Sequence, residues 1–162
     1  MSPVETVLNL IANTQDCLVA RRQETLAIQV DYQLPADLRF YLENYDSVLL
    51  YENSEYPIRI VGLSDFKRAS PVIIGEDIED DISYNWFIIA TGDNSQYITI
   101  DLAKERLGRC HDSFWDRYGV AGEQPIIANS FTEFLQAIYE NRGGYYYWLE
   151  DGFQPIGDAY DM

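Results

Sequence analysis

Acidic residues gather in one short stretch of the sequence, GEDIEDDISYNWF, at positions 75–87. Five of the six residues from position 76 to position 81 are Asp or Glu, and an aromatic run follows at once. Carboxylates at this density could bind a cation, take part in acid–base catalysis or attract a basic protein. The residues around them discriminate between these uses. The acids are Glu76, Asp77, Glu79, Asp80 and Asp81.

A dedicated metal site does not fit the spacing. The alternation of Asp77, Glu79 and Asp81 resembles the first ligands of an EF-hand loop, which requires Gly at its sixth position and Glu at its twelfth. The sequence has Ile82 and Ile88 there, which leaves at most a weak, adventitious cation site. Zinc needs several paired Cys or His ligands, and the chain has two cysteines and one histidine. We therefore expect no metal and no cofactor.

Signals for catalysis are weak. No phosphate-binding glycine loop occurs, and the crowded carboxylates of an exposed loop are usually solvated. His111 is the only histidine, and Cys110 precedes it. Neighbouring strand residues point to opposite faces, which disfavours a Cys–His pair. We expect a protein that is not an enzyme, and a small hydrolase using His111 with nearby acids is the catalytic alternative.

Recognition of a basic protein is the remaining use of the acid run. Crowded carboxylates repel one another, and screening over about 8 Å at physiological salt relieves this only in part. A basic partner would relieve it further and would be attracted from a distance. Tyr84 and Trp86 follow the acids and offer aromatic contact area, although Trp86 also suits the core. The predicted partner-binding patch is the five acids with Tyr84 and Trp86. The alternative is a solvated loop that only supports solubility.

The whole composition agrees with an acidic binding protein. The 162 residues include 27 acidic and 11 basic side chains, for a net charge of −16. Such a chain is repelled by nucleic acid and by anionic membranes, so we expect neither as a partner. No apolar run is long enough to span a membrane, and the N-terminus does not resemble a secretory leader. We expect a cytoplasmic protein that is a monomer or a weak dimer.

The order of predicted elements indicates one α+β domain over residues 1–162. Residues 1–33 are predicted to form an N-terminal helical extension that begins at a Ser2–Glu5 capping box, with a strand or a helical turn at 26–30. Residues 69–84 read as a long exposed loop. Residues 144–162 form an aromatic and acidic tail, whose acids Glu150, Asp151, Asp158 and Asp161 would extend the patch. Helices are predicted at 34–45 and 130–142, strands at 48–51, 58–62, 86–90 and 96–101, a TGDNS hairpin turn between the last two, and an edge strand at 109–111.

Four motifs in this order resemble the SUKH superfamily, the Smi/Knr-like proteins. They are LPADLRFYLENY (34–45), IRIVGLSDF (58–66), YNWFIIATGDNSQYITID (84–101) and IIANSFTEFLQAI (126–138). The ordered set is more specific than any one motif. The sequence departs from the family where Tyr45 follows Asn44, since the family commonly has Asn-Gly there.

The resemblance implies a mixed, mainly antiparallel sheet packed against several helices. It also implies a non-catalytic immunity protein that binds and neutralises a cognate bacterial toxin, often a nuclease or a deaminase. A toxin acting on nucleic acid needs positive charge, which an acidic inhibitor complements. The alternative within the same superfamily is a regulatory or scaffold protein acting through protein–protein contacts.

Overall fold

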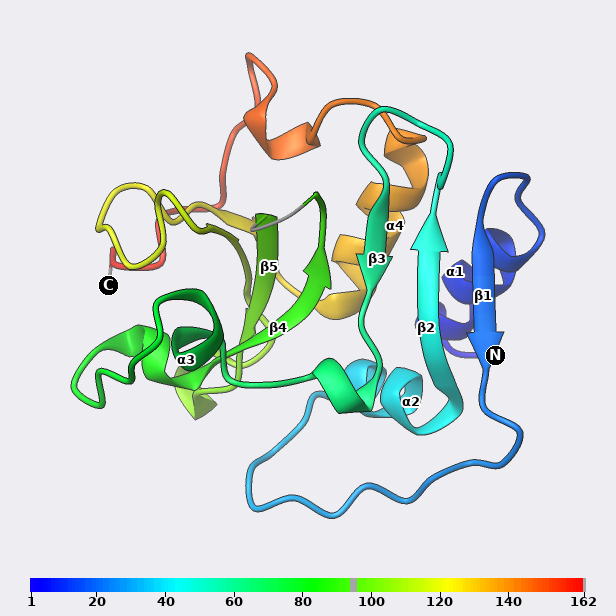
Figure 1. Ribbon diagram of the computed structural model, residues 1–162, viewed down its shortest axis with the longest axis horizontal. Helices are drawn as coiled ribbons and strands as arrows, with labels where there is room; N and C mark the ends of the chain where they lie inside the picture. The colour runs from blue at the N-terminus through cyan, green and yellow to red at the C-terminus, as the bar shows by residue number, and fades with distance from the viewer. Residues whose placement is uncertain (94–95, 162) are drawn as a thin grey trace.

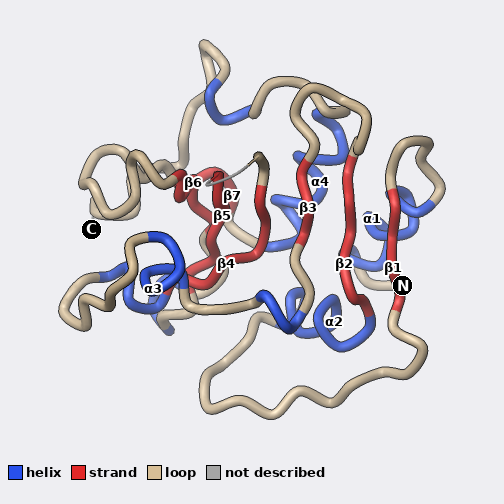
Figure 2. The backbone as a smooth tube through the Cα atoms, in the orientation of Figure 1, coloured by secondary structure: helices blue, strands red, loops and turns tan. Residues whose placement is uncertain are grey.

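A seven-stranded antiparallel sheet forms the centre of the protein (Figures 1 and 2). The structure is a computed structural model, and it describes residues 1–93 and 96–161. The strands lie in the sheet in the order in which they occur in the sequence, and each pairs antiparallel with the next. They are β1 (Leu18–Arg21), β2 (Tyr45–Leu50), β3 (Ile58–Ile60), β4 (Trp86–Thr91), β5 (Gln96–Asp101), β6 (Cys110–Phe114) and β7 (Ile126–Ala128).

Four α-helices accompany the sheet and confirm the α+β class. They are α1 (Pro3–Ala12), α2 (Ala36–Asn44), α3 (Ala69–Ile73) and α4 (Phe131–Asn141). Figure 1 shows α1 and α4 behind the strands, with α2 at the lower end and α3 at the side opposite β1. None of the helices in the described ranges combines the length and the apolar character needed to cross a bilayer.

Strand β4 is central and apolar because both of its faces are covered. It is the fourth of the seven strands, and its residues from Trp86 to Ala90 are buried. On one face Trp86 packs against His111, with ring centroids 4.4 Å apart. On the other face Phe87 stacks on Phe66 at 4.9 Å. The WFIIA run therefore behaves as the central strand that its composition predicts.

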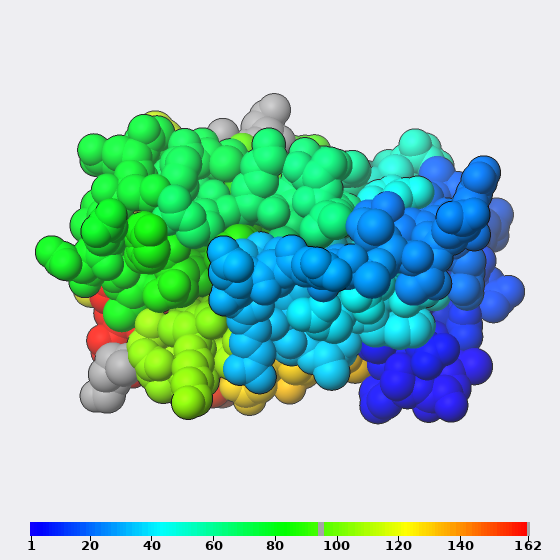
Figure 3. All heavy atoms as spheres, turned by 90° about the horizontal axis from the view of Figure 1, so that it is seen from below, coloured from blue at the N-terminus to red at the C-terminus, as the bar shows by residue number. Residues whose placement is uncertain are grey.

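The N-terminal segment contributes one helix face to the core. The predicted capping box is present, with the Glu5 backbone N–H donating to Ser2 Oγ and the Ser2 N–H donating to Glu5 Oε1. Strand β1 then joins the sheet at its edge. The predicted strand or helical turn at 26–30 is wrong, because this stretch forms an irregular strap that crosses the surface (Figure 3). The apolar face of α1 is buried through Val4, Val7, Leu8 and Ile11.

The C-terminal tail closes the other edge of the sheet. The Ile126 N–H of β7 donates to the Gly157 carbonyl at 2.8 Å, and the Ile156 N–H donates back to the Ile126 carbonyl at 3.2 Å. Trp148 is buried, and its indole N–H donates to Asp112 at 2.9 Å. The tail is therefore packed onto the domain.

Three further expectations need correction or a limit. The predicted edge strand at 109–111 is the interior strand β6, since β7 pairs on its far side. The loop at 69–84 contains helix α3 and the short 3₁₀ turn Ile82–Asn85, and only residues 74–81 between them lie outside helices. The TGDNS turn includes positions 94 and 95, which lie outside the described residues.

Candidate protein-binding surface

The acid run lies on an exposed connection between α3 and the 3₁₀ turn Ile82–Asn85. Gly75 has a φ of 78°, so the chain leaves α3 through a left-handed residue that favours glycine. Residues 74–80 are all exposed. Figure 3 shows this green part of the chain at one end of the molecule, beside the blue strap of residues 22–35. The acids therefore face solvent on a segment that is anchored by structure at both ends.

Asp77 is already paired within the chain. Both of its carboxylate oxygens accept hydrogen bonds from Arg68, at 2.7 and 2.5 Å. The Arg68 guanidinium also lies over the Tyr84 ring, 4.3 Å from its centroid. The hydrogen bond to Asp77 raises the pKa of Arg68 above its ordinary value. Asp77 and half-buried Tyr84 therefore hold Arg68 in place. The charge of Asp77 is balanced by Arg68 and is not free for a partner.

Asp81 is also engaged within the chain. It accepts hydrogen bonds from the Ser83 N–H at 3.0 Å and the Ser83 hydroxyl at 2.5 Å, and so caps the 3₁₀ turn. The Tyr160 hydroxyl donates to the same carboxylate at 2.7 Å. Partial burial acts to raise the pKa of Asp81, but these hydrogen bonds outweigh it and lower the pKa. Asp81 therefore fixes the acid run to the C-terminal tail.

The three remaining acids alternate with exposed aliphatic side chains. Large apolar residues are normally buried, yet Val72, Ile74 and Ile78 are 45%, 38% and 47% exposed. Interfaces commonly combine an apolar centre with a charged rim, and the segment offers both within nine residues. We call this set the acidic–apolar segment: Val72, Ile74, Glu76, Ile78, Glu79 and Asp80.

Two other predicted positions have structural roles. Trp86 is 0% exposed and donates its indole N–H to Asp101 at 3.2 Å, so it belongs to the core and to no surface patch. In the tail, Asp158 accepts from the backbone N–H groups of Gly122, Gln124 and Tyr160. The tail acids that remain exposed are Glu150, Asp151 and Asp161.

The sequence prediction missed the aliphatic half of the segment. Val72, Ile74 and Ile78 stand next to the acids, but an apolar residue in a loop can point inward as easily as outward. The exposure of Val72 and Ile74 follows from the short helix α3, which buries Ala69, Ser70 and Ile73 in their place, whereas Ile78 lies on the connection after the helix. The apolar spacing in ASPVI was the sequence feature that could have indicated this helix.

The described residues do not form the sites that the catalytic and metal alternatives would need. His111 is 1% exposed, and neither ring nitrogen has a hydrogen-bond partner there. A substrate could not reach this imidazole. In the same residues, no group of three or more His, Cys, Asp and Glu side chains is placed to share a metal ion.

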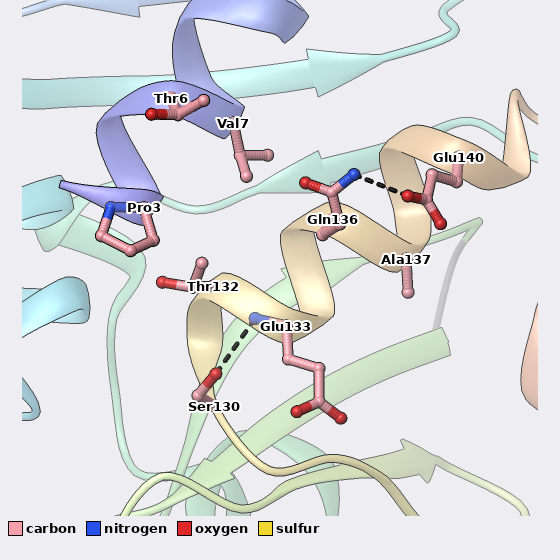
Figure 4. A pocket seen from close by; sticks show the side chains of 9 residues that line it. All are labelled: Pro3, Thr6, Val7, Ser130, Thr132, Glu133, Gln136, Ala137 and Glu140. Atoms are coloured by element: carbon pink, nitrogen blue, oxygen red, sulfur yellow. Dashed lines mark hydrogen bonds between the residues drawn. The ribbon is translucent and has the colours of Figure 1, made fainter. Parts of the chain in front are cut away.

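A hollow lies elsewhere, between α1 and α4 (Figure 4). It has a volume of about 580 Å³. Gln136 donates across its edge to Glu140 at 2.7 Å, and the Glu133 N–H donates to Ser130 Oγ at 3.0 Å. Its polar groups are thus partly occupied by the cap and surface of α4.

Comparison with known proteins gives two matches. The model of the SMI1 / KNR4 family (SUKH-1) matches residues 25–137. The immunity protein YokJ of Bacillus subtilis (strain 168) is 42% identical over 158 residues, which are 98% of this chain and 96% of the relative. No solved structure matches the chain. The family match includes nearly all of the four motifs from LPADLRFYLENY to IIANSFTEFLQAI, and the chain belongs to the SMI1 / KNR4 family (SUKH-1).

Proposed function

We propose that this chain is an immunity protein, which binds a cognate toxin and neutralises it without catalysis. The similarity to YokJ carries this proposal, since it extends over almost the full length of both chains. The buried histidine and the exposed acidic–apolar segment support binding over turnover. We further propose that the toxin is a basic protein that acts on nucleic acid, such as a nuclease or a deaminase, because an acidic surface complements the positive charge such a protein needs.

The acidic–apolar segment is the proposed contact surface. Glu76, Glu79 and Asp80 supply the long-range attraction, because their charges are exposed and no arginine is paired with them in the described structure. Val72, Ile74 and Ile78 supply the apolar area that is buried on contact. Asp77 and Asp81 act indirectly, since they hold the segment to Arg68 and Tyr160.

The proposal is tested by capture followed by a rescue assay. The tagged chain is used as bait in lysate of its source, and a protein bound at one-to-one stoichiometry is then expressed alone and together with the chain. We expect the captured protein to stop growth alone and growth to recover on co-expression. Several weakly bound proteins without toxicity would contradict the immunity function and favour the regulatory or scaffold alternative.

Charge variants then test the contact surface. The triple change Glu76→Gln, Glu79→Gln and Asp80→Asn should slow association with the captured toxin by roughly tenfold at low salt, since steering by exposed charge acts mainly on the association rate. The matched control removes three exposed acids outside the acid run, in Glu24→Gln, Glu52→Gln and Glu55→Gln. Equal slowing in both triple variants would show that net charge matters and the segment does not.

An apolar pair of variants tests the other half of the segment. Ile78→Ala should speed dissociation, because it removes buried contact area from the complex. Ile156→Ala is the control, since Ile156 is 52% exposed and lies in the tail. Stopped-flow or surface-binding kinetics measure both rates. An unchanged dissociation rate in Ile78→Ala would remove Ile78 from the interface.

A further inference from the structure

An exposed tryptophan marks a second surface, far from the acidic–apolar segment in the sequence. The chain has three tryptophans, and two of them are almost fully buried: Trp86 is 0% and Trp148 is 4% exposed. Trp115 is 61% exposed on the turn that follows β6. An indole left in water next to a hollow is a common feature of binding sites, where tryptophan is enriched.

The hollow beside Trp115 has a volume of about 390 Å³, and part of its lining is packed against the core. Phe114 forms part of this lining and packs edge-on against Tyr146 at 5.3 Å and Trp148 at 6.2 Å. Tyr145, which is 42% exposed, adds a second accessible ring to the lining. The aromatic surface is thus held by the core and is open to solvent.

The free charge of this hollow is negative. Arg117 is the one basic residue among the described residues that line it, and it donates a hydrogen bond to the fully buried Asp112. The Arg117 guanidinium also lies over the Phe114 ring, 5.0 Å from its centroid. The buried Asp112 carboxylate therefore balances the charge of Arg117. Asp93 and Asp116 line the same hollow with exposed carboxylates.

Two other places in the chain combine an aromatic ring with a carboxylate, and both hold an arginine side chain. Arg68 lies over Tyr84 while it pairs with Asp77, and Arg117 lies over Phe114 while it pairs with Asp112. In both places a planar guanidinium stacks on an aromatic ring and donates to a carboxylate. Trp115 and Asp116 offer a third ring and carboxylate, and no arginine of the described part of the chain is stacked there.

We propose that the hollow at Trp115 binds an arginine side chain of a basic protein partner. The guanidinium stacks on Trp115, the ring that attracts a cation most strongly, and donates to Asp116. Arginine suits this site better than lysine because its flat, weakly hydrated head can stack and form paired hydrogen bonds at once. The site is independent of the proposed immunity function, since any basic partner could supply the arginine.

A hexa-arginine peptide is the direct probe, with hexa-citrulline as the uncharged control of equal shape. Each is titrated into the ¹⁵N-labelled protein while the three indole N–H signals are followed by NMR. We expect the Trp115 signal to shift with hexa-arginine and to stay in place with hexa-citrulline. The signals of Trp86 and Trp148 should not move. A Trp115 signal that is unmoved, or that moves equally with citrulline, would overturn the proposal.

Variants separate this site from the acidic–apolar segment. Asp116→Asn should weaken the hexa-arginine affinity read from the Trp115 signal about threefold, the size expected for one exposed charge contact. The triple variant Glu76→Gln, Glu79→Gln and Asp80→Asn should leave that affinity within about a factor of two, the part expected from reduced net charge alone. The opposite pattern, with the triple variant abolishing the Trp115 shift and Asp116→Asn leaving it unchanged, would show that the peptide binds elsewhere.

Discussion

At the residue scale, His111 connects the packing of the sheet to the pH dependence of stability. It lies on β6, and its ring contacts Trp86 within the core. Burial disfavours the charged imidazole, and nearby Arg109 adds repulsion, so the pKa of His111 falls from 6.5 to about 3. Asp158 opposes this shift and Arg106 adds to it. The folded protein therefore keeps His111 neutral at a pH where the unfolded chain protonates it.

The consequence is a loss of stability in mild acid. Between pH 6.5 and about 3 the unfolded state binds one more proton at this position than the folded state. The free energy of unfolding should therefore fall by about 1.4 kcal/mol for each pH unit below 6.5 through this group. His111→Leu should remove this slope, as measured by urea unfolding at pH 7.0, 5.5 and 4.5.

The wild-type protein provides an independent check, since His111 is its only histidine. Its ring proton signals should not titrate between pH 8 and pH 5. Buried Asp112, whose pKa is raised by burial, contributes in the opposite direction and is present in both proteins. Parallel pH profiles for wild type and His111→Leu would show that His111 is already protonated or exposed in the folded state.

The five acids show how far residue-level prediction reaches. Sequence places all of them in an exposed connection, which the structure bears out for positions 76 to 80. It does not reveal that Asp81 is bound by Tyr160, because those residues are 79 positions apart. It also leaves Trp86 open between surface and core, since an indole serves both. Partners outside the run, Arg68 for Asp77 and Tyr160 for Asp81, decide which acids keep their charge available.

At the element scale, prediction succeeds where the pattern is local and is incomplete for the buried polar strand β6, for which the sequence predicts only an edge strand at 109–111. Capping residues and apolar periodicity identify the start of α1 and both ends of α4 closely. Strand β6, CHDSF, has no apolar period, yet all five residues are buried. The strand tolerates burial because two of its polar side chains have hydrogen-bond partners. The hydroxyls of Ser113 and Thr99 are hydrogen-bonded at 2.7 Å, and Asp112 accepts a hydrogen bond from the Trp148 indole N–H. Those partners come from β5 and from the tail, so the sequence of β6 alone cannot indicate them.

Helix α1 gives a prediction at the same scale. Its residue Leu8 is 0% exposed, and α1 packs on α4. Leu8→Ala should lower the free energy of unfolding by roughly 2–5 kcal/mol, since it leaves a cavity in the core. Leu10→Ala makes the same chemical change on the exposed side of the helix, where Leu10 is 43% exposed, and should change stability by about 0.5 kcal/mol or less.

Urea unfolding of the two variants shows whether residues 1–33 are an extension or part of the core. A large loss for Leu8→Ala alone means that α1 is needed for the stability of the whole domain. Small, equal losses in both variants would mean that α1 can detach from α4 while the sheet stays folded.

At the scale of the whole molecule, the excess of acidic residues affects the stability of the fold as well as the proposed binding. A net charge of −16 on 162 residues repels itself in the compact state. Salt shortens the range of this repulsion, from about 30 Å at 0.01 M to about 8 Å at 0.15 M. The melting temperature should therefore rise between these two salt concentrations. Proteins whose exposed charges are balanced by ion pairs respond in the opposite direction, because salt weakens the pairs.

The triple variant Glu76→Gln, Glu79→Gln and Asp80→Asn decides whether the acid run is a main source of that repulsion. It changes the net charge from −16 to −13. If crowding within residues 76–81 dominates, the variant should melt at a higher temperature than wild type at 0.01 M salt and should gain less from added salt.

The control triple variant at Glu24, Glu52 and Glu55 has the same net charge with its changes spread out, and its melting temperature at 0.01 M salt should rise less than that of the acid-run variant. Equal behaviour of the two would mean that repulsion is distributed over the surface. A higher melting temperature for the acid-run variant alone would mean that this segment costs the free protein stability, which the proposed basic partner would restore on binding.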